Sequence, residues 1–240
     1  MKNTIKITAI LLFTSIFSSC VFNHSKSGNE NVTTEKRKIN PEITEINVSN
    51  AINVELRQGN KANLEVTADS NLLEDIETYE NGNIIYVKLK NNANLNKYND
   101  LKVAITLPNI YHIKTMGASS LNSNNTFITK ELTIESSSSS NINVSVETEN
   151  LTVDCDSASE IVLSGKAINA KFDSSSSSSI NAFDLLVNNV IAEASSASDI
   201  KCNPIVNLDA KASSAGSVVF MNKPKFIKKE ESSAGTVRQN

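Results

Sequence analysis

A block of small residues returns seven times in the second half of this 240-residue chain. Each block is a run of Ser, Ala or Gly, followed by one polar residue and then an aliphatic one. The aliphatic residues are spaced 21, 19, 19, 20, 18 and 19 positions apart, and they are Leu121, Ile142, Ile161, Ile180, Ile200, Val218 and Val237. So regular a period predicts a stacked repeat architecture, in which each unit is completed by its neighbours.

Each repeat is expected to hold two short strands. Apolar and polar residues alternate after each block, as at Ile161 and Leu163, and again before the next block, as at Ala170 and Phe172. Alternation places one set of side chains on one face of a strand. A single repeat cannot bury enough apolar surface to offset the entropy of ordering it, whereas stacked repeats can. The sequence therefore predicts an all-β fold, with a β-solenoid of two-strand coils over residues 111–240.

The serine runs at 136–140 and 174–179 also have the composition of a disordered linker. A linker would not return at a fixed period with an aliphatic residue in phase, so we favour structure. The low aromatic content of 5%, with no Trp, agrees with many short strands. We expect the small residues to allow a sharp turn between strands, with hydroxyls of successive coils hydrogen-bonded to one another.

Two features follow from the register of the coils. Cys155 falls in the first strand of one coil and Cys202 in the second strand of a coil two layers away. Two layers span about 9.6 Å, beyond the reach of a disulfide, so both residues are expected to be buried free thiols. In the last repeat the inward positions fall on Lys229 and Glu231. Charges on a terminal strand deter edge-to-edge pairing, so we interpret them as a cap.

Residues 41–110 are predicted to form strands without a visible repeat. Apolar and polar residues alternate over 52–56, 62–68, 85–89 and 101–107. Residues 71–76 are expected to form one helical turn. Because no long polar linker separates this half from the repeats, residues 41–240 are expected to form one domain.

Residues 1–19 are typical of a secretory signal peptide. Lys2 and Lys6 precede an apolar run at 7–17, which is shorter than the roughly 20 residues of a transmembrane helix. A retained membrane span is the weaker alternative.

Cys20 follows two serines at the end of this run, a pattern that resembles the bacterial lipobox, although Phe17 stands where Leu is usual. We expect Cys20 to be the acylated first residue of the mature chain, held in the membrane by several acyl chains. The alternative is an ordinary cleaved signal with an incidental Cys. Residues 21–40 are polar and lack apolar periodicity, so residues 20–40 are expected to be the lipidated Cys and a flexible tether.

The segment from Asn50 to Lys90, followed by residues 101–110 and the serine-rich repeats, resembles the putative auto-transporter adhesin head GIN domain family of Bacteroidota-type envelope proteins. The similarity covers roughly residues 42–240. This chain has Ala51-Ile52-Asn53 where the family has Gly-Ile-Asn, and Ser at many corners where the family has Gly. We therefore expect corners that need no positive φ. The resemblance implies adhesion, but it supplies no binding residues.

No catalytic constellation is apparent, so we predict that the protein is not an enzyme and needs no cofactor. The two histidines are His24 and His112, and His112 is expected to face solvent from a strand. Calcium binding by Asp154, Asp156 and Glu160 is a weaker alternative, because these acids do not recur in every coil. A polysaccharide-lyase site would need clustered acids with Arg or Lys, and the chain has only three Arg. The net charge of −3 argues against nucleic acid as a partner.

Two hypotheses for function remain. The first is an adhesion or binding module that presents polar columns to a glycan or an envelope protein. Its candidate surface residues are Ser138, Asn141, Ser157, Glu160, Ser177, Ser196 and Asp199. The second is a structural scaffold that assembles with itself through open end coils. In either case we expect attachment to the outer membrane through Cys20, with the side it faces left open.

Overall fold

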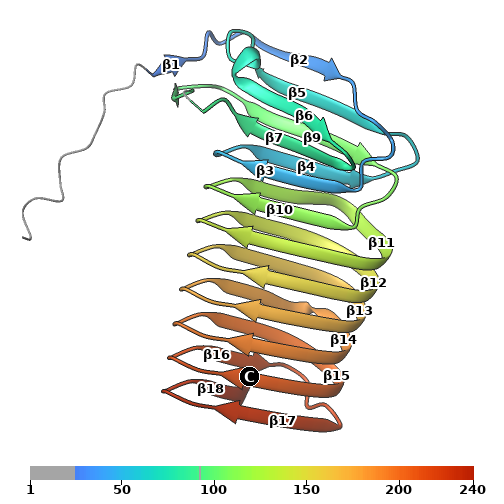
Figure 1. Cartoon of the computed structure of the whole chain (residues 1–240), viewed down its shortest axis with the longest axis vertical. Helices are drawn as coiled ribbons and strands as arrows, with labels where there is room; N and C mark the ends of the chain where they lie inside the picture. Colours follow the sequence, from blue (N-terminus) through green and yellow to red (C-terminus); the bar gives the residue numbers. More distant parts are fainter. Residues whose placement is uncertain (1–24, 92) are drawn as a thin grey trace, which may run out of the picture.

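The computed structural model describes residues 25–91 and 93–240, and these residues form a column of stacked coils (Figure 1). Strands make up 67% of the described residues, and about seven solenoid turns lie over residues 112–239. The predicted all-β solenoid, preceded by non-repeated strands, is confirmed. The predicted signal peptide, Cys20 and His24 lie outside the described residues.

The repeats form nine strands, most of them long. β11 to β15 each combine the second strand of one coil, a bend, and the first strand of the next coil, so the two short strands expected per repeat are joined. The strands are β10 (His112–Met116), β11 (Ser120–Ser137), β12 (Asn141–Cys155), β13 (Glu160–Ser174), β14 (Ser179–Ala194), β15 (Asp199–Ala212), β16 (Ser217–Phe220), β17 (Phe226–Glu231) and β18 (Thr236–Gln239).

Successive coils pair in parallel, in the register that the repeat predicts. Leu121 pairs with Ile142, Ile142 with Ile161, and the column continues to Val237. A second inward column runs from Ile113 through Phe172 to Lys229. These inward side chains form the core, and they are nearly all fully buried. The longer repeats are accommodated by register shifts, such as the one between Asn122 and Thr126.

Strands from the first half of the chain continue the stack beyond β10 and β11, at its N-terminal end. These are β3 (Glu45–Ser49), β4 (Asn53–Gln58), β5 (Asn63–Asp69), β6 (Ile76–Asn81), β7 (Ile84–Leu89), β8 (Leu95–Asn96) and β9 (Leu101–Leu107). β3 pairs with β10 and β4 pairs with β11, so together they form one further coil. In the next layer, β7 pairs with β3 and β9 pairs with β4. Residues 45–58 are therefore a repeat that an insertion separates from the others.

Antiparallel strands cover the N-terminal end of the stack. β5 pairs with β9, and β6 pairs with β7. The helical turn expected at residues 71–76 is confirmed as the 3₁₀ segment η1 (Leu73–Asp75). Among the described residues, no helix has the length and apolar character needed to cross a membrane.

The expectation of a flexible tether is wrong for residues 26–37. This segment, which we call the N-terminal strap, contains β1 (Lys26–Ser27) and β2 (Val32–Arg37). β1 pairs with β8, and β2 pairs along its whole length with β5. The strap was missed because its side chains are mostly polar, whereas its pairing is made by the backbone.

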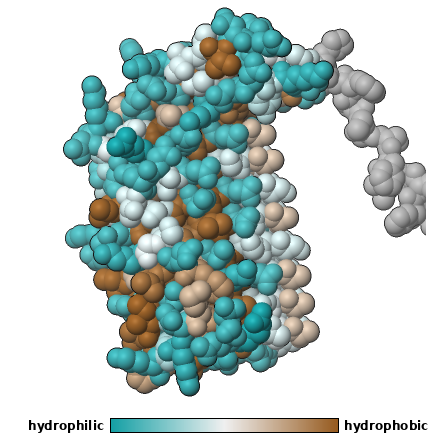
Figure 2. All heavy atoms as spheres, turned by 180° about the vertical axis from the view of Figure 1, so that it is seen from behind, coloured by the Kyte–Doolittle hydropathy of each residue, from teal (hydrophilic) through white to brown (hydrophobic). Residues whose placement is uncertain are grey.

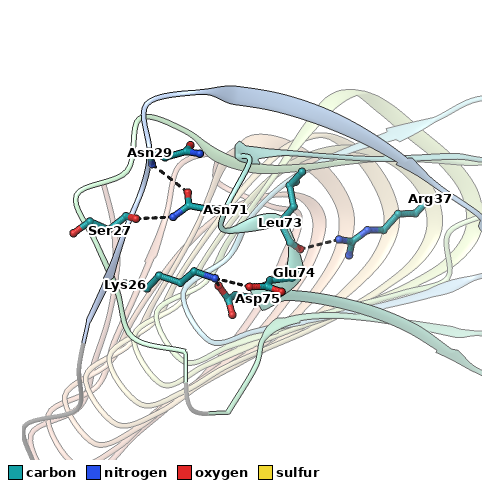
Figure 3. Close-up of polar contacts among 8 residues, drawn as sticks. All are labelled: Lys26, Ser27, Asn29, Arg37, Asn71, Leu73, Glu74 and Asp75. Atoms are coloured by element: carbon teal, nitrogen blue, oxygen red, sulfur yellow. Dashed lines mark hydrogen bonds and ion pairs between the residues drawn. The ribbon is translucent and has the colours of Figure 1, made fainter.

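Side chains fasten the strap to the end of the stack, as Figure 3 shows. The Arg37 guanidinium donates to the carbonyl oxygens of Ile76, at 2.6 Å, and Leu73, at 3.0 Å. Lys26 forms ion pairs with Glu74 at 2.7 Å and Asp75 at 2.8 Å. The strap is therefore part of the folded unit, whose core and both end coverings lie within the described residues.

Both register predictions for single residues are confirmed. Cys155 and Cys202 are buried free thiols, and burial raises the pKa of Cys155 and raises that of Cys202 to about 12. Lys229 and Glu231 pair in register with Ala210 and Ala212 on the last coil. Lys229 donates to the carbonyl oxygen of Val237, and Glu231 accepts from the N–H of Val237. These two side chains therefore cap backbone groups of the final strand.

Candidate functional site

The tight corners of the coils form a ridge that runs along the left edge of the stack in Figure 1. Each corner contains two successive residues with positive φ, such as Ser157 at 54° and Ala158 at 61°. The eight pairs are Asn50–Ala51, Gly117–Ala118, Ser138–Ser139, Ser157–Ala158, Ser176–Ser177, Ser196–Ala197, Ser214–Ala215 and Ser233–Ala234. The expectation that these corners need no positive φ is wrong.

Stacking explains why residues other than glycine adopt this conformation. A left-handed residue with a Cβ costs roughly 1–2 kcal/mol. At each corner, however, the backbone continues to pair with the next coil. The Ala158 N–H donates to the Ser176 carbonyl oxygen at 3.0 Å, and the Ser139 N–H donates to the Ser157 carbonyl oxygen at 3.0 Å. These bonds hold a geometry that the local sequence does not favour.

The seven candidate surface residues lie in columns on and beside this ridge, and all are exposed. Ser138, Ser157 and Ser196 occupy the first left-handed position of their corners, whereas Ser177 occupies the second. The others begin the strand that follows a corner. Asn141 pairs with Glu160, and Ser179 lies between Glu160 and Asp199 in the same column. The structure thus brings the predicted residues together on one edge of the molecule.

A different serine is buried in each of the first five blocks, and in all but the first of these it joins neighbouring coils; the last two blocks have Gly216 and Gly235 at this place. Ser159 donates to the carbonyl oxygen of Ser136 at 2.8 Å, and Ser178 to that of Cys155 at 2.7 Å. Ser198 donates in the same way to Ser174, at 2.7 Å. The expected cross-coil bonding of hydroxyls is thus made mainly to backbone carbonyls. Bonds between hydroxyls of different coils also occur, such as Thr115 with Ser136 at 3.1 Å.

A charged groove of about 570 Å³ lies on the strands that lead into the corners. The groove is lined by the carboxylates of Asp154, Asp173 and Glu193 and by hydroxyls such as those of Ser175 and Ser195. Asp173 pairs with Lys171 at 2.7 Å, and Glu193 with Lys211 at 3.1 Å. Burial raises the pKa of Asp154, and the neighbouring charge of Asp173 raises it further.

The acids considered for calcium are not brought together. Asp154 and Asp156 line the charged groove, whereas Glu160 lies beyond the corner at the start of β13. Within residues 25–91 and 93–240, no group of three or more His, Cys, Asp or Glu side chains is arranged to hold a metal ion. His112 lies on the outer face, as expected, between Glu45 at 3.5 Å and Glu135 at 3.1 Å.

A second groove, of about 690 Å³, lies at the open bends on the opposite side of the stack. We call it the aliphatic groove. Figure 2 shows hydrophobic atoms gathered along this side, away from the ridge of small residues. Its exposed aliphatic residues are Ile128 (65% exposed), Ile168 (47%), Leu186 (46%) and Ile205 (42%). This groove was not predicted from the sequence. The signal that could have indicated it is the presence of aliphatic residues at positions outside the alternating inward rows.

The model of the family described as "Putative auto-transporter adhesin, head GIN domain" matches residues 42–224. The chain belongs to this family. The match covers both the first half from residue 42 and most of the repeats, in agreement with the resemblance in the sequence. No curated protein matches the chain.

Solved structures show the same fold at low identity. A putative adhesin from Bacteroides fragilis has a TM-score of 0.83 at 21% identity, with 90% of this chain and 100% of that chain covered. A putative adhesin from Parabacteroides merdae has a TM-score of 0.72 at 17% identity, with 90% and 99% covered. A structure from Parabacteroides distasonis, described as a putative lipid binding protein, has a TM-score of 0.73 at 21% identity, with 90% and 100% covered.

The family and these neighbours are described as adhesins or binding proteins and not as enzymes. An adhesin-like family implies a protein of the cell envelope or surface. The family description thus narrows the class of protein to adhesin-like proteins of the cell envelope or surface.

Proposed function

We propose that this protein is a non-catalytic envelope lipoprotein whose solenoid binds a glycan or another envelope protein through the corner ridge and the column beside it. One observation carries the proposal: the same backbone corner recurs in coil after coil. Polar groups on it are therefore repeated at the strand spacing of about 4.8 Å. A regular array of this kind suits a ligand with its own repeat, because weak contacts add along the array.

The chemistry of the ridge supports a polar ligand. The first left-handed position is a serine in six of the eight corners, and the second position is an alanine in six of them. The adjoining column adds the amide of Asn141 and the carboxylates of Glu160 and Asp199. Short hydroxyl side chains can donate and accept hydrogen bonds. They are also held on a rigid backbone, which lowers the entropy lost on binding.

Binding by residues 25–240 to a glycan array tests the ligand class. The fragment should begin at residue 25, because the strap is part of the sheet. We expect Asn141→Ala combined with Asp199→Ala to reduce binding at least about tenfold if two contacts are lost. Thr133→Ala combined with Thr152→Ala, on the strands that lead into the corners, is the matched control. Equal loss in both pairs, or no binding to any glycan or envelope extract, would count against the ridge.

The anchor is proposed from the sequence alone. Cys20→Ala should abolish incorporation of labelled palmitate and release the protein from the membrane fraction. Protease treatment of intact cells then separates a surface location, where the domain is cut, from a periplasmic one, where it is protected. Palmitate incorporation that persists in Cys20→Ala would contradict the assignment of the anchor.

A scaffold that grows through its end coils is the second candidate. The C-terminal coil offers little support for such growth, because Lys229 donates to the carbonyl oxygen of Val237 and Glu231 accepts from its N–H. The strap and the antiparallel strands cover the other end.

A further inference from the structure

One column of the aliphatic groove has a sequence that complements itself when reversed. Ile128 pairs in register with Glu147, Glu147 with Lys166, and Lys166 with Leu186, in four successive layers. Read downward the column is aliphatic, acidic, basic, aliphatic. When a second copy of the column is placed antiparallel to the first, each acidic residue lies opposite a basic one and each aliphatic residue lies opposite an aliphatic one.

The column stands on a surface that nothing covers within the described residues. Ile128 and Leu186 are 65% and 46% exposed. Ile168 and Ile205 also line the groove, together with the small residues Thr148 and Ala167. A contiguous exposed apolar patch with a polar rim is typical of an interaction surface.

We propose that the aliphatic groove is the interface with a second copy of this chain, placed antiparallel across a two-fold axis. The axis lies between the layers of β12 and β13 and perpendicular to the stack. It brings Glu147 of one copy opposite Lys166 of the other, and Ile128 opposite Leu186. A two-fold interface uses the same patch twice, so self-complementarity is the property it requires.

The layer spacing makes the match cooperative. Both copies repeat at about 4.8 Å, so alignment of one pair aligns the other three. The layer that holds Glu147 and Glu149 then faces the layer that holds Lys166 and Ile168. Within one chain Glu147 and Lys166 already pair at 2.9 Å, with half-exposed side chains that can share a second partner.

The charges in the middle of the column favour a second copy over an apolar ligand. An acyl chain laid along the groove would cover Glu147 and Lys166 without offering them any polar partner, and burying charge without a partner is costly. A second copy leaves both charges paired and buries the aliphatic residues at the two ends.

Charge reversal with mixing tests this arrangement by the molecular mass of residues 25–240 in solution, from micromolar to near-millimolar concentration. We expect the wild type to dimerise. Glu147→Lys alone and Lys166→Glu alone should each dimerise at least about tenfold more weakly, because symmetry creates two like-charge contacts. An equimolar mixture of the two variants should form dimers again, although the ion pair within each chain is broken in both.

Glu193→Lys mixed with Lys211→Glu is the matched control, because this pair has similar geometry on the opposite face. Neither variant should alter dimerisation. A wild type that stays monomeric, or a mixture that associates no better than its components, overturns the proposal. So does a monomer that binds a fluorescent fatty acid in a manner abolished by Leu186→Lys, since the occupant would then be an acyl chain.

A cysteine pair reports the antiparallel register directly. Oxidation of Ile128→Cys mixed with Leu186→Cys should give a disulfide-linked heterodimer, since the native thiols are buried. Ile128→Cys alone should cross-link poorly, because residue 128 faces residue 186 and not itself. The reverse pattern would contradict the antiparallel arrangement.

Discussion

At the scale of the residue, serines of one block have different roles that their sequence context does not reveal. Ser178 is buried and donates to the carbonyl oxygens of Cys155 and Ser175, both at 2.7 Å. Ser119 occupies the equivalent place in the first block and is equally buried. Its hydroxyl, however, has no hydrogen-bond partner within the described residues.

We expect Ser178→Ala to lower the free energy of unfolding by about 0.5–1.5 kcal/mol, because it removes a buried hydroxyl bond between coils while the Cys155 carbonyl keeps the N–H of Ser175. Ser119→Ala should leave stability unchanged or slightly raised, because it removes a buried polar group that has no partner. Urea denaturation of both variants measures the difference. Equal losses would show that these hydroxyls do not join the coils.

Asp154 provides a prediction about pH. Its folded-state pKa is raised, first by burial and then by Asp173, so the folded state resists ionisation of this carboxyl group. A raised acid pKa contributes stability below the unfolded pKa, about 3.9, and that contribution is lost as the pH rises through the folded value.

Asp154→Asn should therefore be more stable than the wild type at pH 7, by a few tenths of a kcal/mol because the site is partly solvated. The gain should disappear near pH 3, where the aspartate is protonated in both states. Thermal unfolding over this range tests the sign. A variant that is less stable at pH 7 would show that the carboxylate has a favourable partner.

At the scale of the element, the strap provides the sharpest difference between expectation and structure. Its sequence from Val32 to Arg37 has only one aliphatic residue, so periodicity cannot identify it. The strap is held by backbone pairing with β5 and by Arg37, whose partners are carbonyl groups distant in sequence. Such partners are known only once the fold places them.

Arg37→Ala should lower the free energy of unfolding by about 1.5–3 kcal/mol, since it removes charge-assisted bonds to Ile76 and Leu73. Lys36→Ala is the control, because that side chain is 78% exposed and its pair with Glu65 is 3.5 Å long. Chemical denaturation compares the two. No loss in Arg37→Ala would support the tether originally expected.

The last coil gives a prediction about solubility. The Lys229 ammonium lies over the Phe220 ring, 4.9 Å from its centroid. Lys229 and Glu231 also form hydrogen bonds with the backbone of Val237. Removing both side chains by Lys229→Ala with Glu231→Ala should expose a strand edge and promote concentration-dependent aggregation, as seen by light scattering.

Lys228→Ala with Glu230→Ala removes the same charges from exposed positions of the same strand, where the two residues pair at 2.7 Å. It should aggregate no more than the wild type. Aggregation of both double variants alike would show that charged side chains at any position of this strand, and not the cap, protect this end.

At the scale of the whole molecule, the repeat alone was sufficient to predict the architecture and the register of its inward columns. The columns from Leu121 to Val237 align as the period requires, because a one-residue slip would turn each aliphatic side chain to solvent. The seven candidate surface residues were likewise placed on one edge. Their role in binding stays a prediction.

Three features could not be predicted from the sequence, and each has a physical reason. The left-handed corners contradict the local preference of Ser and Ala, and they depend on neighbouring coils. The coil at residues 45–58 is separated from its neighbours by an insertion, so its repeat was not visible in the spacing. The aliphatic groove forms from exposed residues such as Ile128 and Ile168, whose proximity appears only after stacking.

The measurement that tests the stacked-coil account most directly is amide hydrogen exchange at the corners. Exposed turns normally exchange quickly, but here the N–H groups of Ser139, Ala158, Ser177 and Ala197 donate to the next coil at 3.0 Å. We predict that these amides are protected to a similar extent as those of the flanking strands. Exchange at the rate of an unstructured peptide, recurring at each serine block, would contradict the stack.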